Sequence, residues 1–161
     1  MQEESEYLKS KGKLDLSNEV VRALWWKQPY ASAMLIGKVE TRTWETKIRG
    51  KVLICASQKG YSEKQIFEIS GEEIGTWMYR DMAHFNVLPD SDLLGHAIAI
   101  GDLVDCRPMR KEDESDTYVQ YCEGLWCHIY QNVQAIKPFP IKGAQGWRIL
   151  TDEQKNMIEL L

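Results

Sequence analysis

Short stretches of alternating apolar and polar residues recur along this chain and predict β-strands. Residues 20–26 are rich in β-branched and aromatic side chains, which favour extended backbone. Residues 39–43 alternate between apolar and polar positions, and a continuous apolar run follows at residues 52–55. A turn at Arg49-Gly50 separates the two, so the first is expected to be an exposed strand or arm and the second a buried central strand.

The second half of the chain predicts further strands. Residues 96–108 are β-branched and alternating, and Gly101 within them predicts a bulge or a bend at a barrel corner. Residues 125–136 predict either a pair of strands or one bulged strand. Residues 138–150 contain Pro and Gly, which favour an irregular arm leading into a last short strand.

Helical segments are predicted at three places. Pro29 opens a helix that Gly37 closes. Residues 62–85 carry apolar residues at helical spacing, and Gly71 and Gly75 are expected to divide them into two short helices. The C-terminal residues predict a helix with Thr151 or Asp152 as its N-cap.

The order of these elements predicts one α+β domain. Several short strands with helical insertions, without βαβ alternation, favour a β-barrel with helices flanking a cleft. We expect a flexible N-terminal tail over residues 1–17 and a single domain over residues 18–161, a size typical of one domain. The polar run at residues 111–116 is expected to be a solvated loop. Three tryptophans in apolar segments are expected in the core: Trp25, Trp77 and Trp126.

The charge distribution adds a local feature to this fold. The net charge of −4 argues against a protein that coats DNA without specificity. Residues 27–51, however, include six cationic residues and two glutamates, which gives this segment a local charge of +4. Such a patch favours an anionic ligand bound at one place, although a lysine-rich solvated strand edge has the same pattern.

The remaining composition indicates what the protein lacks. No apolar run approaches the roughly 20 residues of a membrane span, and the charged N-terminus does not resemble a signal peptide. We therefore expect a cytoplasmic protein with reduced cysteines. Cys127 and His128 are adjacent and would point to opposite faces of a strand, so buried thiols are favoured over a metal site. The glycine pairs in GEEIG and GAQG lack the spacing of a phosphate loop, and no cofactor is expected.

Three blocks of sequence resemble the ASCH family, named for activating signal cointegrator homology. The first is QPYASAMLIGKVETRTWETKIRGKVLICAS, which is similar to a Gln-Pro-(aromatic)-Ala helix start, a Gly-x-Lys-x-x-Glu-x-Arg motif and an Arg-Gly turn into a strand. The others are GHAIAIGDLVDCRPM and the segment from Trp126 to Trp147, which resemble two barrel strands and a Pro-x-x-Gly-x-x-Gly arm. The resemblance covers about residues 20–150 and implies a PUA-like β-barrel.

The resemblance also implies a cleft around Lys38, Glu40 and Arg42. One departure concerns Lys38, which precedes Glu40 by two residues where the family motif has three, and a one-residue slip on a strand turns a side chain to the opposite face. We treat Lys38 and Glu40 as the catalytic candidates. The residues expected to contact ligand are Trp26, Lys27, Gln28, Tyr30, Lys38, Glu40, Arg42, Trp44, Arg49 and Ser57.

The chemistry of these side chains suits a nucleobase. Arg42 offers a planar donor fork for a phosphate or a base edge, and Glu40 can accept from an exocyclic amine or act as a general base. Lys38 is a compact charge, or a nucleophile when desolvated. Aromatic faces for an unstacked base are expected from Trp26, Tyr30 and Trp44, whereas Glu40 and Arg42 could equally form an ion pair that only holds the arm to the barrel.

Three classes of function follow from these residues and the resemblance. The first is binding of RNA, or of a modified nucleobase or nucleoside, in the cleft. The second is an enzyme: one ASCH branch resembles amidohydrolases that deacylate N(4)-acetylcytidine with a Lys, a Thr and a Glu, and other members are nucleases. In the amidohydrolase branch a Thr stands where this chain has Glu40, and Thr41 has the opposite strand parity. The third is a protein-interaction adaptor.

Overall fold

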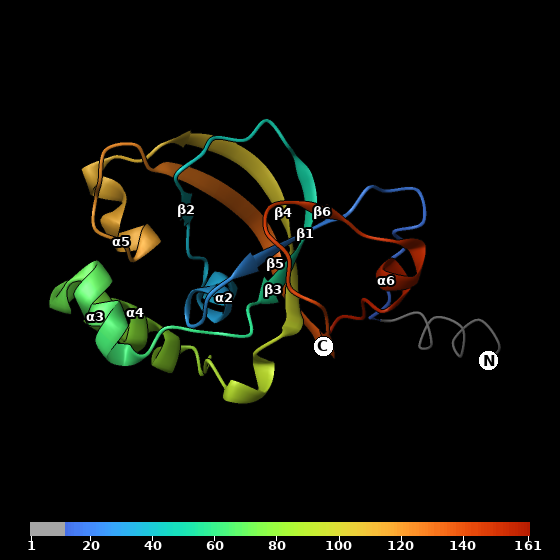
Figure 1. Ribbon diagram of the computed structural model, residues 1–161, viewed down its shortest axis with the longest axis horizontal. Helices are drawn as coiled ribbons and strands as arrows, with labels where there is room; N and C mark the ends of the chain where they lie inside the picture. The colour runs from blue at the N-terminus through green and yellow to red at the C-terminus, as the bar shows by residue number, and fades with distance from the viewer. Residues whose placement is uncertain (1–11) are drawn as a thin grey trace.

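The computed structural model describes residues 12–161 and contains one curled six-stranded sheet (Figure 1). The strands lie in the order β2-β5-β4-β3-β1-β6, and among the strands of residues 12–161 only the β1–β3 pair is parallel. Their bounds are β1 Arg22–Trp26, β2 Glu40–Arg42, β3 Gly50–Ala56, β4 His96–Pro108, β5 Trp126–Pro140 and β6 Arg148–Ile149. The predicted α+β class is confirmed, in the form of a half-barrel.

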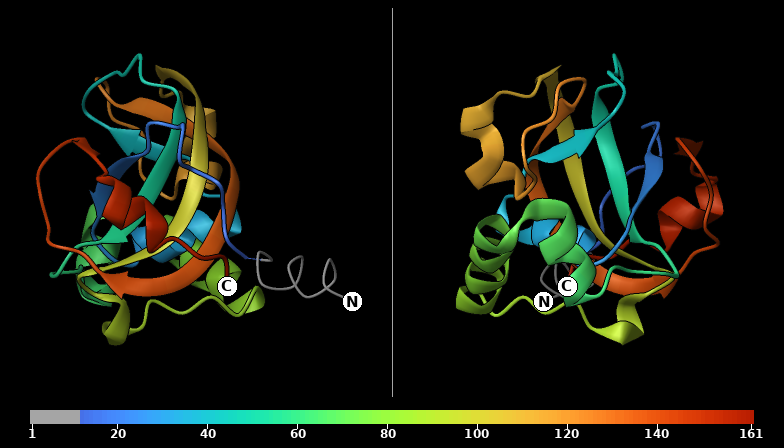
Figure 2. Two further views of the ribbon diagram at one scale, coloured as in Figure 1. Left: turned by 90° about the vertical axis from the view of Figure 1, so that its right-hand side faces the viewer. Right: turned by 60° about the vertical axis from the view of Figure 1, so that its left-hand side comes forward.

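The helices lie around this half-barrel. In Figure 1, α3 and α4 lie at one side and α6 lies at the other, and the turned views in Figure 2 show the sheet curling between them. The helical elements are α2 Tyr30–Ala33, η1 Met34–Ile36, α3 Glu63–Ser70, α4 Glu72–His84, η2 Ser91–Leu93, η3 Lys111–Asp113, α5 Glu114–Thr117 and α6 Asp152–Asn156. No helix within residues 12–161 is long and apolar enough to cross a membrane.

The long strands β4 and β5 give the sheet its curl. Their pairing shifts register at three places, one of them between Ile100 and Asp102. Gly101 lies at this shift, where an added Cβ would be 2.9 Å from Cγ2 of Val133 on β5. The predicted bulge at Gly101 is therefore confirmed, and residues 126–136 belong to one bulged strand, β5, rather than to a pair.

The core lies on both faces of the sheet. Ala23, Leu53 and Cys55 pack into a cluster on one face, while Leu24 and Ile54 belong to a second cluster on the other. Successive residues of a strand point to opposite faces, so the continuous apolar run of β3 is buried on both sides as predicted. A third cluster joins α2 to α3 and α4.

The predicted helices are present, but one predicted boundary is wrong. Gly71, with a φ of +83°, separates α3 from α4 as expected. Gly75 instead lies inside α4, where an added Cβ would be 2.6 Å from the ring of Phe67. Gly75 is thus used for the close approach of two helices and not for a break. The N-cap of α6 is Thr151, whose hydroxyl accepts from the N–H of Gln154.

The polar run at residues 111–116 is not a solvated loop. It forms η3 and most of α5, and Asp113 within it is buried. The carboxylate of Asp113 accepts two hydrogen bonds from the guanidinium of Arg107 on β4, at 2.8 and 2.9 Å, and one from the N–H of Arg110 at 2.7 Å. The expectation was wrong because an ion pair, which composition does not reveal, offsets the cost of burying a charged side chain.

The described part of the N-terminal segment contacts the body of the protein. Residues 1–11 of the expected tail lie outside the described residues. Leu16 is buried in the core, and Lys13 forms a β-bridge and a 3.6 Å ion pair with Glu159 near the C-terminus. Residues 13–16 are therefore packed against the domain.

Candidate functional site

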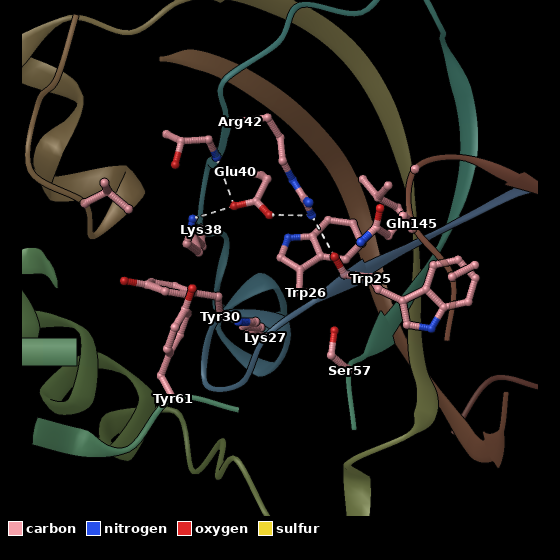
Figure 3. Close-up of a pocket in the computed structure, with 15 residues that line it drawn as sticks. Trp25, Trp26, Lys27, Tyr30, Lys38, Glu40, Arg42, Ser57, Tyr61 and Gln145 are labelled. Atoms are coloured by element: carbon pink, nitrogen blue, oxygen red, sulfur yellow. Dashed lines mark hydrogen bonds and ion pairs between the residues drawn. The ribbon is translucent and has the colours of Figure 1, made fainter. Parts of the chain in front are cut away.

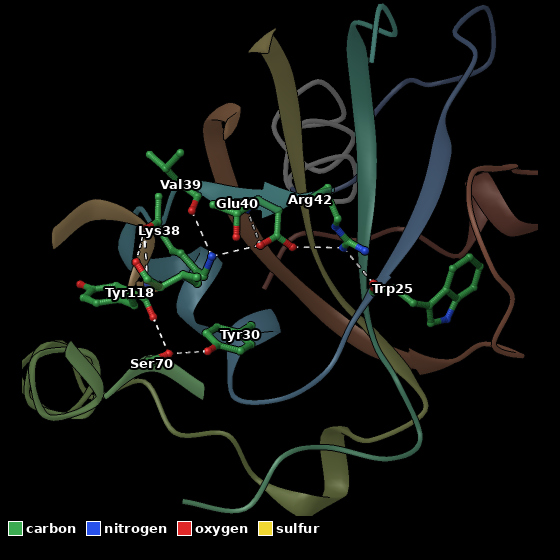
Figure 4. A network of polar contacts seen from close by, with 11 residues as sticks. Trp25, Tyr30, Lys38, Val39, Glu40, Arg42, Ser70 and Tyr118 are labelled. Atoms are coloured by element: carbon green, nitrogen blue, oxygen red, sulfur yellow. Dashed lines mark hydrogen bonds and ion pairs between the residues drawn. The ribbon is translucent and has the colours of Figure 1, made fainter. Parts of the chain in front are cut away.

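The motif side chains lie together beside the β2 edge of the sheet. Lys38, Glu40 and Arg42 are two residues apart, so their side chains share one face (Figure 4). The Lys38 ammonium lies 3.0 Å from Oε1 of Glu40, and Arg42 Nη2 lies 3.1 Å from Oε2 of the same carboxylate. The shortened Lys-to-Glu spacing therefore does not remove Lys38 from the site.

These three charges are largely removed from solvent. The side chain of Lys38 is 0% exposed and that of Glu40 is 7% exposed. Burial lowers the pKa of Lys38, although the Glu40 carboxylate opposes this effect. Burial raises the pKa of Glu40, but the charges of Lys38 and Arg42 and two hydrogen bonds outweigh it and hold that pKa below its usual value. Glu40 is therefore an anion at neutral pH.

Arg42 also joins the edge strand β2 to the end of β1. Its Nη2 donates to the carbonyl oxygen of Trp25 on β1 at 3.0 Å, while Arg42 itself belongs to β2. The neighbouring strand β6 pairs with β1 only at Arg22 and Ala23, so it does not cover Trp25. The guanidinium lies 5.0 Å from the ring centroid of Trp26, close enough for a cation–π contact. Arg42 thus bridges the opening of the half-barrel.

A cavity of about 420 Å³ opens beside this network (Figure 3). Aromatic side chains form much of its wall, and the Lys38–Glu40–Arg42 network lies along one side. Seven of the ten residues expected to contact ligand line it: Trp26, Lys27, Tyr30, Lys38, Glu40, Arg42 and Ser57.

Tyr30 is held in this wall by a chain of hydrogen bonds. Its hydroxyl lies 2.9 Å from Oγ of Ser70, which donates in turn to the carbonyl of Tyr118 at 2.9 Å (Figure 4). Burial raises the pKa of Tyr30, so the phenol stays neutral. The Lys38 ammonium lies 5.2 Å from the Tyr30 ring centroid. The hydrogen bond with Ser70 therefore holds the Tyr30 hydroxyl, and the Lys38 ammonium lies against the Tyr30 ring.

Three expected ligand contacts do not line the cavity. Gln28 is buried and exchanges two hydrogen bonds with Ser32, at 2.7 and 2.9 Å, which support α2. Trp44 packs edge-on against His128 and Trp147. Arg49 is exposed and donates to carbonyls of its own turn. These three side chains support neighbouring structure instead of the cavity wall.

Other lining residues were not predicted. Trp25, expected in the core, is only half-buried and lines the cavity from the end of β1, beyond the residues that pair with β6. Tyr61 lines it from the loop after β3, and Lys27 lies 4.9 Å above its ring. Gln145 comes from the arm before β6, where two flanking glycines were the available signal. Thr41, despite its opposite strand parity, also contributes to the lining.

Cys127 and His128 point to different surroundings, as their strand positions predict. Cys127 Sγ lies 3.7 Å from Asp113, and burial raises its pKa to about 11. His128 Nε2–H donates to the carbonyl of Trp44 at 2.8 Å, and burial lowers its pKa. Within residues 12–161 no group of three His, Cys, Asp or Glu side chains is arranged to hold a metal ion.

Comparison with known proteins relates this chain to activating signal cointegrators. No protein-family model matches it. Over 120 residues it is 30% identical to activating signal cointegrator 1 from Mus musculus and, equally, from Homo sapiens. The aligned region covers 72% of this chain but 20% of each relative, so the chain spans about a fifth of the length of the curated relatives it matches. Because the ASCH family takes its name from these cointegrators, the similarity supports a distant relation to that family.

Proposed function

We propose that residues 18–161 form an ASCH domain of the PUA-like class whose cavity binds a nucleobase or nucleoside, presented by RNA or another nucleic acid. The three resembling sequence blocks, the curled sheet and the similarity to activating signal cointegrator 1 support the domain assignment. The four cysteines are all free thiols, which agrees with a cytoplasmic setting as part of this proposal.

The aromatic cavity is the observation that carries the proposal. Its volume of about 420 Å³ lies within the range of small-ligand pockets. Trp25 and Trp26 lie on one side and Tyr30 and Tyr61 on another (Figure 3). Trp25, Tyr30 and Tyr61 are partly exposed and can stack on a base, and such a contact contributes about 1–3 kcal/mol. Trp26, expected as a stacking face, is 2% exposed and lies behind the Arg42 guanidinium, so it supports the wall instead. Lys27 beside Tyr61 adds a cation for a ligand phosphate.

The ion network favours binding over catalysis. A nucleophilic lysine must be neutral and free to approach its substrate. Here the Lys38 ammonium donates to Glu40 at 3.0 Å and to the carbonyl of Val39 at 3.0 Å, and its side chain has no exposed surface. We therefore assign Lys38, Glu40 and Arg42 the role of a rigid charged wall that positions the ligand edge.

In the experiment, the protein is titrated with nucleosides and with a short single-stranded RNA, and its tryptophan fluorescence reports binding. Binding should quench Trp25, because it lies partly exposed in the cavity wall. Tyr61→Ala should weaken binding by about 5- to 150-fold, the loss that corresponds to one stacking contact. Tyr121→Ala is the matched control, since Tyr121 is exposed and does not line the cavity.

Two results would contradict this function. Unchanged fluorescence with every nucleoside and with the RNA would remove the binding proposal. Release of cytidine from N(4)-acetylcytidine, or cleavage of the RNA, would show catalysis, and loss of that product in Lys38→Met would assign it to this site. We expect both substrates to remain intact.

A further inference from the structure

The cavity continues outward as a groove. Two more cavities, of about 350 and 300 Å³, adjoin the first, and Trp25 and Ala144 line all three. The groove follows the arm between β5 and β6 and passes Gly143 on its way to Gln154. If a base is bound in the first cavity, the nucleotides attached to it can therefore extend along the groove.

The outer part of this groove is cationic. Lys142 lines both outer cavities and Arg148 lines one of them. Neither forms an ion pair with a carboxylate among residues 12–161, whereas other lysines do, such as Lys51 with Asp102 at 3.1 Å. No Asp or Glu of the described chain lines either outer cavity. The positive charge here is available to an external anion, in contrast to that of Lys38.

Trp25 lies where the pocket and the outer groove meet. It is half-buried, lines all three cavities and points away from the ion network in Figure 3. An aromatic plate between a base-sized pocket and two free cations is the arrangement that proteins use for single strands, in which bases stack and phosphates meet cations. An acidic peptide would use the cations but not the stacking plate.

We propose that this groove binds a single-stranded nucleic acid, with one base in the first cavity, the next base on Trp25 and the following phosphates at Lys142 and Arg148. The inference rests on the proposed function and extends it from a base to a strand. It follows that an oligonucleotide binds more tightly than a nucleoside of the same base, and that only the oligonucleotide depends on Lys142 and Arg148.

The test compares cytidine with RNA and DNA single strands of about six nucleotides, a length within the site sizes of such grooves. Affinities of the full chain and of Lys142→Ala/Arg148→Ala are measured across a series of salt concentrations. Each phosphate contact on a single strand contributes about 0.7 to the slope of log affinity against log salt, so the double variant should have a slope shallower by about 1.4. Its affinity for cytidine should be unchanged.

Two further variants make the result specific. Lys64→Ala removes an exposed cation on α3, across the molecule from the arm in Figure 1, and should leave the salt slope unchanged. Gly143→Glu places a negative charge in the groove at a position where an added Cβ meets nothing within 4 Å. It should weaken oligonucleotide binding without affecting cytidine.

The outcomes separate the two proposals. Equal affinity for cytidine and both oligonucleotides, or a slope unaltered in Lys142→Ala/Arg148→Ala, overturns the groove and leaves the base pocket standing. Tighter binding of a glutamate-rich peptide than of either oligonucleotide also overturns it. Binding of neither cytidine nor oligonucleotide removes the base pocket itself. A preference for RNA or for DNA identifies the sugar that the groove accepts.

Discussion

Glu40 is the residue on which the site depends most. Its carboxylate accepts from Lys38, from the N–H of Thr41 and from Arg42, and it belongs to a short edge strand with little backbone pairing of its own. Taking charges out of water is costly, and only mutual pairing offsets that cost. The same network therefore holds β2 in place and shapes the cavity wall.

Neutralising Glu40 alone should destabilise the fold more than neutralising Lys38 and Glu40 together. Glu40→Gln leaves the ammonium of Lys38 buried without a counter-charge, and we expect a loss of about 3–5 kcal/mol in the free energy of unfolding. Lys38→Met/Glu40→Gln removes both charges and should lose less. Urea unfolding measures both values, and a double variant that is as unstable as the single one would contradict this account.

At the level of elements, η3 and α5 depend on one carboxylate. Asp113 lies beside the C-terminal end of β4, where Arg107 donates a hydrogen bond to each of its carboxylate oxygens. Hydrogen bonding from Arg107 holds the pKa of Asp113 well below its usual value, although burial opposes the effect. A carboxyl with a lowered pKa stabilises the fold above its usual pKa, and that contribution is lost as the pH falls through the pKa of the folded state.

This linkage predicts the pH dependence of an Asp113→Asn variant. Near pH 6 the variant should be less stable than the natural chain by about 1.5–3 kcal/mol, the contribution of a hydrogen bond to a charged group. The difference should shrink as the pH falls below about 4, because the natural chain then loses its advantage. Urea midpoints at a series of pH values measure it. A difference that stays constant into strong acid would show that the carboxylate charge has no role.

At the level of the whole molecule, Arg42 connects parts of the sheet that no backbone pairing joins. β2 and β6 are the sheet edges, and the guanidinium of Arg42 reaches from β2 to the carbonyl of Trp25 on β1. The bridge lies at the mouth of the cavity, so the closure of the half-barrel and the geometry of the site depend on the same side chain.

Removing this bridge should loosen one edge selectively. Arg42→Met keeps the packing on Trp26 but removes the donors, and we expect a loss of about 2–3 kcal/mol. Amide exchange should accelerate in β2 and the following loop more than in β3, which is paired on both sides. Arg49→Met is the control, because Arg49 is exposed, donates hydrogen bonds within its own turn and has only a solvent-exposed 4.0 Å ion pair with Asp105 beyond it. Uniform acceleration in both strands would contradict a local role.

Local features of the sequence were sufficient for the elements and for the motif. Two-residue spacing on a strand is sufficient to place Glu40 and Arg42 on one face, and Pro29 and Gly37 correctly enclosed a helical segment, because strand parity and helix boundaries depend on neighbouring residues. The bulge at Gly101 was predictable for the same reason. These features needed no knowledge of distant contacts.

Only the tertiary structure decided which side chains surround the cavity. Trp25, Tyr61 and Gln145 come from three separate segments, and the curl of the sheet brings them together. Long-range pairing also decided the charges: Lys51 pairs with Asp102 and Arg49 lies 4.0 Å from Asp105, so the local charge of +4 does not form one open patch. Sequence spacing determined the shared face of Glu40 and Arg42 because the strand backbone is local, whereas the tertiary structure decided that Lys38 joins them. The cavity and the groove were decided by curvature and packing, which depend on contacts between residues far apart in the chain.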